Sequence, residues 1–253
     1  MKAVIMYHSL DRSGSPISLN PETFARHVRW LASGRVRVVP LERLSGDSAE
    51  GDAVALTFDD AFLNFATVAA PLLAEYDLPS TLFVVSGCAG GTNAWGGVAH
   101  RRIPTLDLLD WDAICTLARD GVAIGAHTRS HPRLGAIGDT RMTDEIAGSS
   151  EDILRHVGMR PAAFAYPFGD VTDAAARCVR AHYAYACTTD LRMLSAREDP
   201  ALLPRLDAYY LRKPGSLESW GSPAFSRFVR RRALARRLRS RIRDRMQSAG
   251  KVA

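Results

Sequence analysis

Short apolar segments alternate with segments of helical periodicity along most of the chain. Residues 53–58 are apolar and rich in β-forming types, so they predict a short buried strand. The other segments of this kind are residues 2–7, 36–40, 80–85, 122–126, 162–166, 184–188 and 202–206. Helices are predicted between them, at residues 21–32, 63–76, 108–119, 143–157 and 173–181. This alternation indicates an α/β domain with a parallel sheet or barrel.

Several of these strands end in polar, reactive residue types. His8 follows the first strand, Asp59 and Asp60 follow residues 53–58, and His127 follows residues 122–126. Parallel α/β folds place their chemistry at the carboxyl ends of the strands. Asp60 could instead cap the next helix, because Asp is a preferred N-cap residue. The recurrence of such residues at strand ends favours a common site.

The spacing of His127 and His131 predicts a metal site. On a helical turn, residues four apart face the same way, about 6 Å from each other. Two imidazoles so placed can bind one divalent cation, and a carboxylate as third ligand leaves positions open for water and substrate. Taken alone, such a pair is more often an ordinary surface or core pair than a metal site.

Three motifs together resemble those of the NodB-like polysaccharide deacetylases, carbohydrate esterase family 4. They are residues 57–60 (TFDD), 127–131 (HTRSH) and 164–169 (FAYPFG). Residues 6–9 (MYHS) are similar to the opening strand of a subgroup that de-N-acetylates exopolysaccharides. The resemblance covers about residues 3–210. It implies a distorted, incomplete (β/α)7-type barrel in a domain of residues 1–222, followed by a basic tail or helix at residues 223–253.

The resemblance also implies a metal centre and a set of catalytic roles. One divalent cation is expected, zinc first, with cobalt, nickel or manganese as alternatives. Its expected ligands are Asp60, His127 and His131. Asp59 would be the general base, and the backbone N–H of Phe168 would stabilise the oxyanion.

Two positions depart from the family pattern. No histidine follows His182, so the late general acid of many members is missing, and His8 is expected to take its role as in the exopolysaccharide subgroup. Ala165 stands where the third motif usually carries an arginine that braces the base. Arg205 could brace Asp59 from another strand, or it could form a surface ion pair with Asp207.

Three aromatic residues and one proline in or near the motifs are candidates for sugar contacts. Tyr166, Pro167 and Phe168 lie in the third motif, and Trp95 lies in a glycine-rich loop at residues 87–103. Strand aromatics are more often core residues, and a loop tryptophan can be an anchor. The histidines outside the motifs are expected to be structural or exposed: His27, His100, His156 and His182. Asp170 is a candidate cap for the helix at residues 173–181.

Composition adds constraints on compartment and redox state. The chain has 253 residues, of which 47% are hydrophobic, and no apolar run approaches the length of a membrane span. The first residues read as a strand and not as a secretory leader, so a cytoplasmic protein is expected. Four cysteines without CxxC spacing predict buried, reduced thiols and not a disulfide framework or zinc knuckle.

The net charge of +6 is concentrated near the end of the chain. Residues 225–246 contain ten arginines and one aspartate, a local charge of +9 that leaves −3 for the rest. This segment could form a helix with Phe228, Ala235, Leu238 and Ile242 near one face. A basic amphipathic helix can adsorb to an anionic membrane. Nucleic-acid binding and a simply solvated charge run are the alternatives.

The sequence therefore predicts a metal-dependent hydrolase that removes N-acetyl groups from an amino sugar of a polysaccharide, glycan or lipid-linked glycan precursor. One alternative is an allantoinase-like hydrolase of cyclic ureides on the same fold. A second, prompted by Ala165 and the missing late histidine, is a catalytically inactive carbohydrate-binding protein. Nucleic acid is not expected as a partner, because only the basic tail favours it. We expect a cytoplasmic enzyme with peripheral contact to the inner face of a membrane.

Overall fold

The computed structural model describes residues 1–44 and 51–249, in which strands and helices alternate as predicted. The strands are β1 (Lys2–Tyr7), β2 (Arg37–Val38), β3 (Ala53–Phe58), β4 (Ser80–Val84), β5 (Ala123–Ala126), β6 (Ala163–Ala165), β7 (Tyr185–Cys187) and β8 (Arg205–Asp207). The α-helices are α1 (Pro21–Ala32), α2 (Leu41–Leu44), α3 (Ala70–Glu75), α4 (Trp111–Arg119), α5 (Asp139–Val157), α6 (Asp173–His182) and α7 (Pro223–Ala249).

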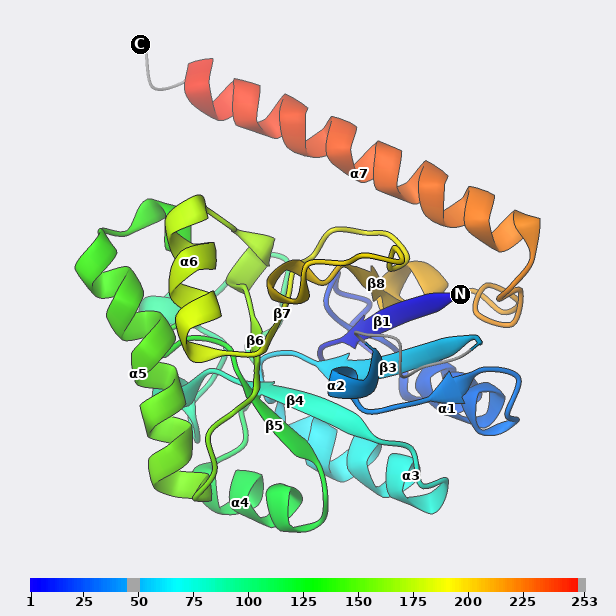
Figure 1. Ribbon diagram of the computed structural model, residues 1–253, viewed down its shortest axis with the longest axis horizontal. Coiled ribbons are helices and arrows are strands. Elements are labelled where there is room, and N and C mark those ends of the chain that lie inside the picture. Colours follow the sequence, from blue (N-terminus) through cyan, green and yellow to red (C-terminus); the bar gives the residue numbers. More distant parts are fainter. Residues whose placement is uncertain (45–50, 250–253) are drawn as a thin grey trace.

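The strands form one parallel sheet that curls into a nearly closed barrel. Their order is β7-β6-β5-β4-β3-β1-β8, and β2 pairs with β3 beside this path. The two edges approach each other where Leu203, just before β8, bridges to Cys187 of β7 and donates its N–H to the carbonyl of Ala186. Helices cover the outside of the barrel (Figure 1). The fold is the predicted distorted (β/α)7 barrel.

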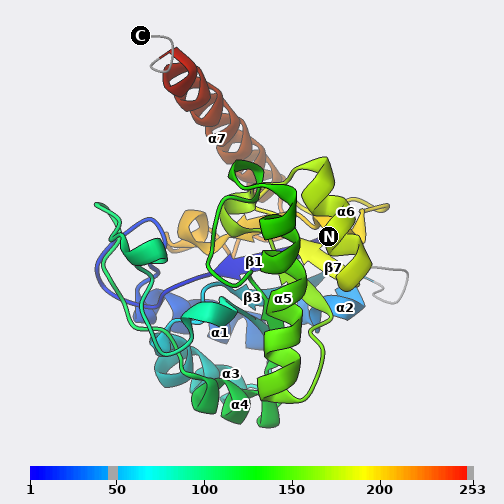
Figure 2. The same ribbon diagram turned by 90° about the vertical axis from the view of Figure 1, so that its left-hand side faces the viewer.

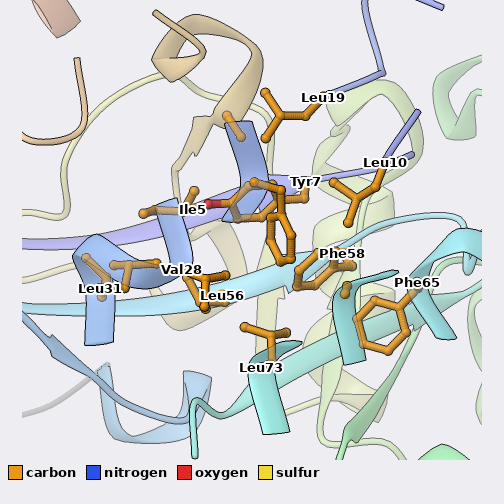
Figure 3. Close-up of a cluster of buried hydrophobic side chains, with 14 of the residues drawn as sticks. Ile5, Tyr7, Leu10, Leu19, Val28, Leu31, Leu56, Phe58, Phe65 and Leu73 are labelled. Carbon is orange, nitrogen blue, oxygen red and sulfur yellow. The ribbon is translucent and has the colours of Figure 1, made fainter. Parts of the chain in front are cut away.

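The largest apolar cluster lies between the barrel wall and the helices that cover β1 and β3. Alternate residues of a strand face opposite sides, so Ile5, Tyr7, Leu56 and Phe58 point outward into this cluster (Figure 3). The rings of Tyr7 and Phe58 stack with their centroids 5.0 Å apart. Since β1 and β3 lead directly to His8 and Asp59, this packing holds the two strand ends in a fixed relation.

The interior of the barrel is narrow and lined mostly by small side chains. Val4, Ala53, Ala55 and Ala163 share an interior cluster with Phe83. At Gly125 of β5 even a Cβ atom would lie 2.5 Å from the ring of Phe83. These small residues surround the space into which a large polar side chain, described below, extends from β8.

Some predicted boundaries are wrong for identifiable reasons. The helix predicted at residues 63–76 begins with a π-helical turn, Phe65–Ala69, before α3. The helix predicted at 108–119 begins at Trp111, because Asp110 caps it by accepting the N–H of Ala113. The helix predicted at 143–157 begins four residues earlier, at Asp139.

The basic tail is helical, and its first turns pack into the core of the barrel domain. α7 spans Pro223–Ala249, and Phe225 and Val229 are buried in the main apolar cluster. The boundary predicted at residue 222 therefore precedes two core residues. Further along, α7 stands clear of the barrel (Figures 1 and 2). Within the described residues, no helix combines the length and apolar character needed to cross a membrane.

Candidate active site and metal centre

The polar residues that follow the strands meet at one rim of the barrel. Asp60 follows β3, and His127 and His131 follow β5. The three side chains are buried, and one ligand atom from each lies within 4.8 Å of the others. The carboxyl ends of neighbouring parallel strands thus bring together residues up to 71 positions apart, as the sequence predicted for a metal site.

The rim is built from backbone conformations that side chains usually avoid. Among the described residues, six non-glycine residues have positive φ angles, and five of them belong to the motif loops: Asp60, Ala61, Thr128, His131 and Phe168. Left-handed backbone at non-glycine residues costs free energy and concentrates at functional sites. Here it turns each chain segment sharply at the end of its strand, so that the side chain points into the site.

Residues 127–131 do not form the helical turn that the spacing suggested. They are irregular, and Thr128 and His131 adopt left-handed φ angles of 66° and 57°. The hydroxyl of Thr128 accepts the N–H of His131 at 3.0 Å and holds this bend closed. The two imidazole rings nevertheless meet, edge to face, with their centroids 4.8 Å apart.

The donor atoms are arranged as a cation site requires. Oδ1 of Asp60 lies 3.5 Å from Nε2 of His127 and 3.4 Å from Nε2 of His131. Nδ1 of His127 lies 2.7 Å from the carbonyl oxygen of Ala165. Because a carbonyl only accepts hydrogen bonds, this Nδ1 carries the proton, and the lone pair of Nε2 faces Asp60. Such an outer hydrogen bond is typical of metal-binding histidines.

Two buried atoms of the site have no hydrogen-bond partner among the described residues. They are Oδ1 of Asp60 and Nδ1 of His131. Burial raises the pKa of Asp60 and lowers the pKa of His131 well below its usual value. A neutral imidazole is the form that binds a metal, and a cation would compensate the buried carboxylate. The residues present therefore fit one divalent cation. Asp60 is not a helix cap, since the next helical segment is preceded by Asn64.

Asp59 is held by Arg205. Nη1 and Nη2 of Arg205 donate to the two carboxylate oxygens of Asp59 at 2.6 and 2.7 Å, and Nε donates to the carbonyl of Thr188. Arg205 is fully buried in the barrel interior, with its guanidinium 5.7 Å from the ring centre of Phe83. The alternative of a surface ion pair with Asp207 is excluded by this burial. Arg205 thus reaches Asp59 from β8, whereas the third motif has Ala165 where the sequence resemblance led us to expect an arginine.

The environment keeps Asp59 ionised. Burial alone would raise its pKa, but the positive charge of Arg205, together with its hydrogen bonds to the carboxylate, lowers the pKa to about 2. Nε2 of His8 lies 3.7 Å from Oδ2 of Asp59, on a side chain that is 19% exposed. Asp59 therefore has an arginine on one side and a partly solvent-accessible imidazole on the other.

The candidate sugar-contact residues separate into two groups. Phe168 is 47% exposed and its ring meets that of His131 edge to face at 4.6 Å, while Trp95 stacks on His131 at 4.4 Å. Tyr166 was wrongly assigned: it is fully buried, and its hydroxyl donates to the carbonyl of Ala201. Pro167 is buried as well. Tyr166 and Pro167 support the motif from within the core, as strand residues commonly do.

The remaining residue assignments have mixed outcomes. Only Cys187 is buried, whereas Cys88, Cys115 and Cys178 are half-buried, and these described cysteines are free thiols. Asp170 does not cap α6. Its carboxylate accepts the N–H of Gly135, and Thr172 provides the cap.

A group of acids on α5 that the sequence analysis missed supports the second motif. Glu145 is 4% exposed and accepts the N–H groups of Arg129 and Ser130 at 2.9 and 2.8 Å, together with the hydroxyl of Ser130. Asp152 forms a two-bond ion pair with Arg129 and accepts the hydroxyl of Ser86. The sequence feature that could have indicated this role is the seven-residue spacing of the two acids, which places them on one face of the helix.

Replacing Glu145 by alanine is expected to weaken metal binding about 10- to 100-fold, the usual range for residues that orient metal ligands. The change would leave two N–H groups and a hydroxyl without their acceptor and release the loop between His127 and His131. Zinc affinity, measured by competition with a chromophoric chelator, tests this expectation. Glu151→Ala, at an exposed acid of the same helix, is the matched control. Equal zinc affinity in both variants would contradict the role of Glu145.

Comparison with known proteins agrees with this geometry. The family model described as polysaccharide deacetylase matches residues 46–186, which is more than half of the chain. The chain belongs to the polysaccharide deacetylase family. The matched segment contains β3 to β6 with all three candidate metal ligands, whereas His8 and Arg205 lie outside it.

Individual relatives are distant. YxkH of Bacillus subtilis (strain 168), named as a polysaccharide deacetylase, is 25% identical over 171 residues. The peptidoglycan-N-acetylglucosamine deacetylase of Bacillus cereus is 27% identical over 121 residues. These matches cover 66% and 47% of this chain but only 56% and 38% of the relatives. The solved structure of IcaB from Ammonifex degensii shares the fold, with a TM-score of 0.71 at 23% identity over 89% of this chain and 96% of that chain.

Proposed function

We propose that this deacetylase is a metal-dependent hydrolase that removes N-acetyl groups from an amino sugar. The observation that carries the proposal is that two adjacent acids, Asp59 and Asp60, have different partners. Asp60 faces two imidazoles at 3.4–3.5 Å, while Asp59 is turned to Arg205 and stays outside that cluster. One carboxylate is thus available to a cation and the other to a proton.

The low pKa of Asp59 defines what it can do. A carboxylate with a pKa of about 2 is unprotonated near neutral pH, but it is a weak base. A divalent cation at Asp60, His127 and His131, zinc first, would lower the pKa of water toward neutrality. Asp59 then accepts the proton of the attacking water, and Arg205 keeps its carboxylate oriented and charged.

The leaving nitrogen of the scissile amide requires a proton donor. An amide nitrogen leaves poorly as an anion, so it must be protonated as the C–N bond breaks. His8 is the proposed donor, because it lies at the rim beside Asp59 and is partly exposed to solvent. The backbone N–H of Phe168 is the proposed donor to the oxyanion.

The proposed substrate is an N-acetylated amino sugar within a glycan. Phe168 and Trp95 provide aromatic surface beside His131, against which the apolar face of a sugar ring can pack. The peptidoglycan-N-acetylglucosamine deacetylase among the relatives supports this class. In keeping with the basic tail, we propose a lipid-linked glycan precursor at the inner face of a membrane as the setting.

Acetate release from N-acetylglucosamine oligomers by the zinc-loaded protein tests the proposal. We expect release by the wild-type chain and a loss of at least about 100-fold in kcat for Asp59→Asn, since general base catalysis contributes about 10²–10⁴-fold. Hydrolysis of allantoin instead of the oligomer would favour the ureide alternative. Oligomer binding without acetate release, at full zinc occupancy, would favour an inactive carbohydrate-binding protein.

A further inference from the structure

The direction of α7 is fixed by its first turns. Phe225 is fully buried and Val229 is 5% exposed, and the ring of Phe225 packs against that of Trp220. The guanidinium of Arg232 lies 5.7 Å from the ring centre of Tyr210 and 5.4 Å from that of Phe228. The face of the helix that carries these residues therefore packs against the rest of the domain.

The opposite face of α7 carries a basic strip with two leucines. We define the strip as the exposed residues Arg227, Arg230, Arg231, Leu234 and Leu238. Their spacing of three and four residues places them on one side of the helix. Leu234 is 61% and Leu238 is 51% exposed. The structure thus corrects the prediction that Phe228 and Leu238 share a face, because Phe228 packs on the body.

Among the residues that the structure describes, the strip has no acidic partner. None of the ion pairs between residues that the structure describes involves Arg227, Arg230 or Arg231. Residues 225–246 carry a charge of +9 and the rest of the chain −3. Even so, beyond its buried first turns the helix extends clear of the barrel, toward the side on which the strands end (Figure 1).

We propose that the strip binds the surface of an anionic phospholipid bilayer. Arginine matches the phosphate of a lipid headgroup through paired N–H donors, and a leucine pair between arginines can enter the boundary between headgroups and acyl chains. Nucleic acid would use the arginines but offers little to two exposed leucines, so the bilayer fits the whole strip. Resting on the proposed function, this contact would hold the catalytic rim near glycans that are linked to lipid.

Sedimentation with vesicles tests the proposal on the full chain. We expect binding to vesicles of equimolar phosphatidylglycerol and phosphatidylcholine, weakened by salt, and little binding to pure phosphatidylcholine. Each basic residue near such a surface contributes about 1 kcal/mol, so Arg230→Glu with Arg231→Glu should weaken binding at least about 30-fold. Leu234→Ser with Leu238→Ser should weaken it at least about tenfold, because the apolar contact is lost.

Two controls separate this proposal from others. Arg29→Glu with Arg177→Glu makes the same charge change at exposed arginines of α1 and α6, and should bind as the wild type does. Asp59→Asn should also bind normally, so a failed deacetylation assay would leave the vesicle result intact. Truncation at residue 222 is unsuitable, since it removes Phe225 and Val229 from the core. The proposal would be overturned by equal binding to both vesicle types, or by an equal loss of binding in the control variant. It would also be overturned if the strip caused dimerisation or RNA binding while the protein did not bind vesicles.

Discussion

Replacing Arg205 by methionine is expected to lower the free energy of unfolding by about 3–5 kcal/mol, because it leaves the buried carboxylate of Asp59 without its counter-charge. We also expect kcat for deacetylation to fall at least about 100-fold, since the uncompensated carboxyl takes up a proton and cannot accept another. Urea unfolding and acetate release measure the two effects.

Companion variants show whether the effect passes through Asp59. Arg205→Lys keeps the charge but not the paired geometry, so an intermediate loss of stability is expected. In the double variant Asp59→Asn with Arg205→Met, removing the charge should restore part of the stability lost in Arg205→Met alone, without restoring activity. Purely additive losses would show that Arg205 acts only by filling the barrel.

Changing Asp60 to asparagine should separate metal binding from stability. The wild-type chain is expected to bind one equivalent of zinc, and a ligand at 100 times its Kd stabilises the native state by about 2.7 kcal/mol. In Asp60→Asn this gain should disappear. The metal-free variant should be at least as stable as the metal-free wild type, because burial raises the pKa of Asp60 and its Oδ1 has no partner among the described residues.

Isothermal titration with zinc and thermal unfolding with and without zinc measure both parts of this prediction. Glu75→Gln, at an exposed acid of α3, is the matched control and should behave as the wild type in both. His127→Ala and His131→Ala should lose zinc binding as Asp60→Asn does. Unchanged zinc affinity in Asp60→Asn would remove this carboxylate from the metal site.

The sequence was most informative about strand ends and least informative about how side chains reach the site. Apolar segments followed by acids or histidines located the rim, because parallel strands place their carboxyl ends together. The route to the histidine pair was mispredicted, since spacing alone cannot distinguish a helical turn from a bend closed by Thr128. Tyr166 was misassigned because a three-residue strand buried on both faces shows no alternation.

Long-range partners were the other limit of sequence reasoning. Arg205 had two plausible partners, Asp59 and Asp207, and only barrel closure decides between them. Glu145 reads as an ordinary helix acid until α5 is packed against residues 129–130. For α7, the helix was predicted but its orientation was not, because the body-facing side is set by contacts with Tyr210 and Trp220.

The pairing of Asp59 with Arg205 joins residues 146 positions apart, one directly after β3 and the other on β8, the last of the described strands. During synthesis, the segment that carries Asp59 is made long before the segment that carries its counter-charge, Arg205. A partly synthesised chain that ends before β8 lacks the arginine that pairs with this carboxylate. The counter-charge of Asp59 therefore arrives only with the segment that completes the barrel.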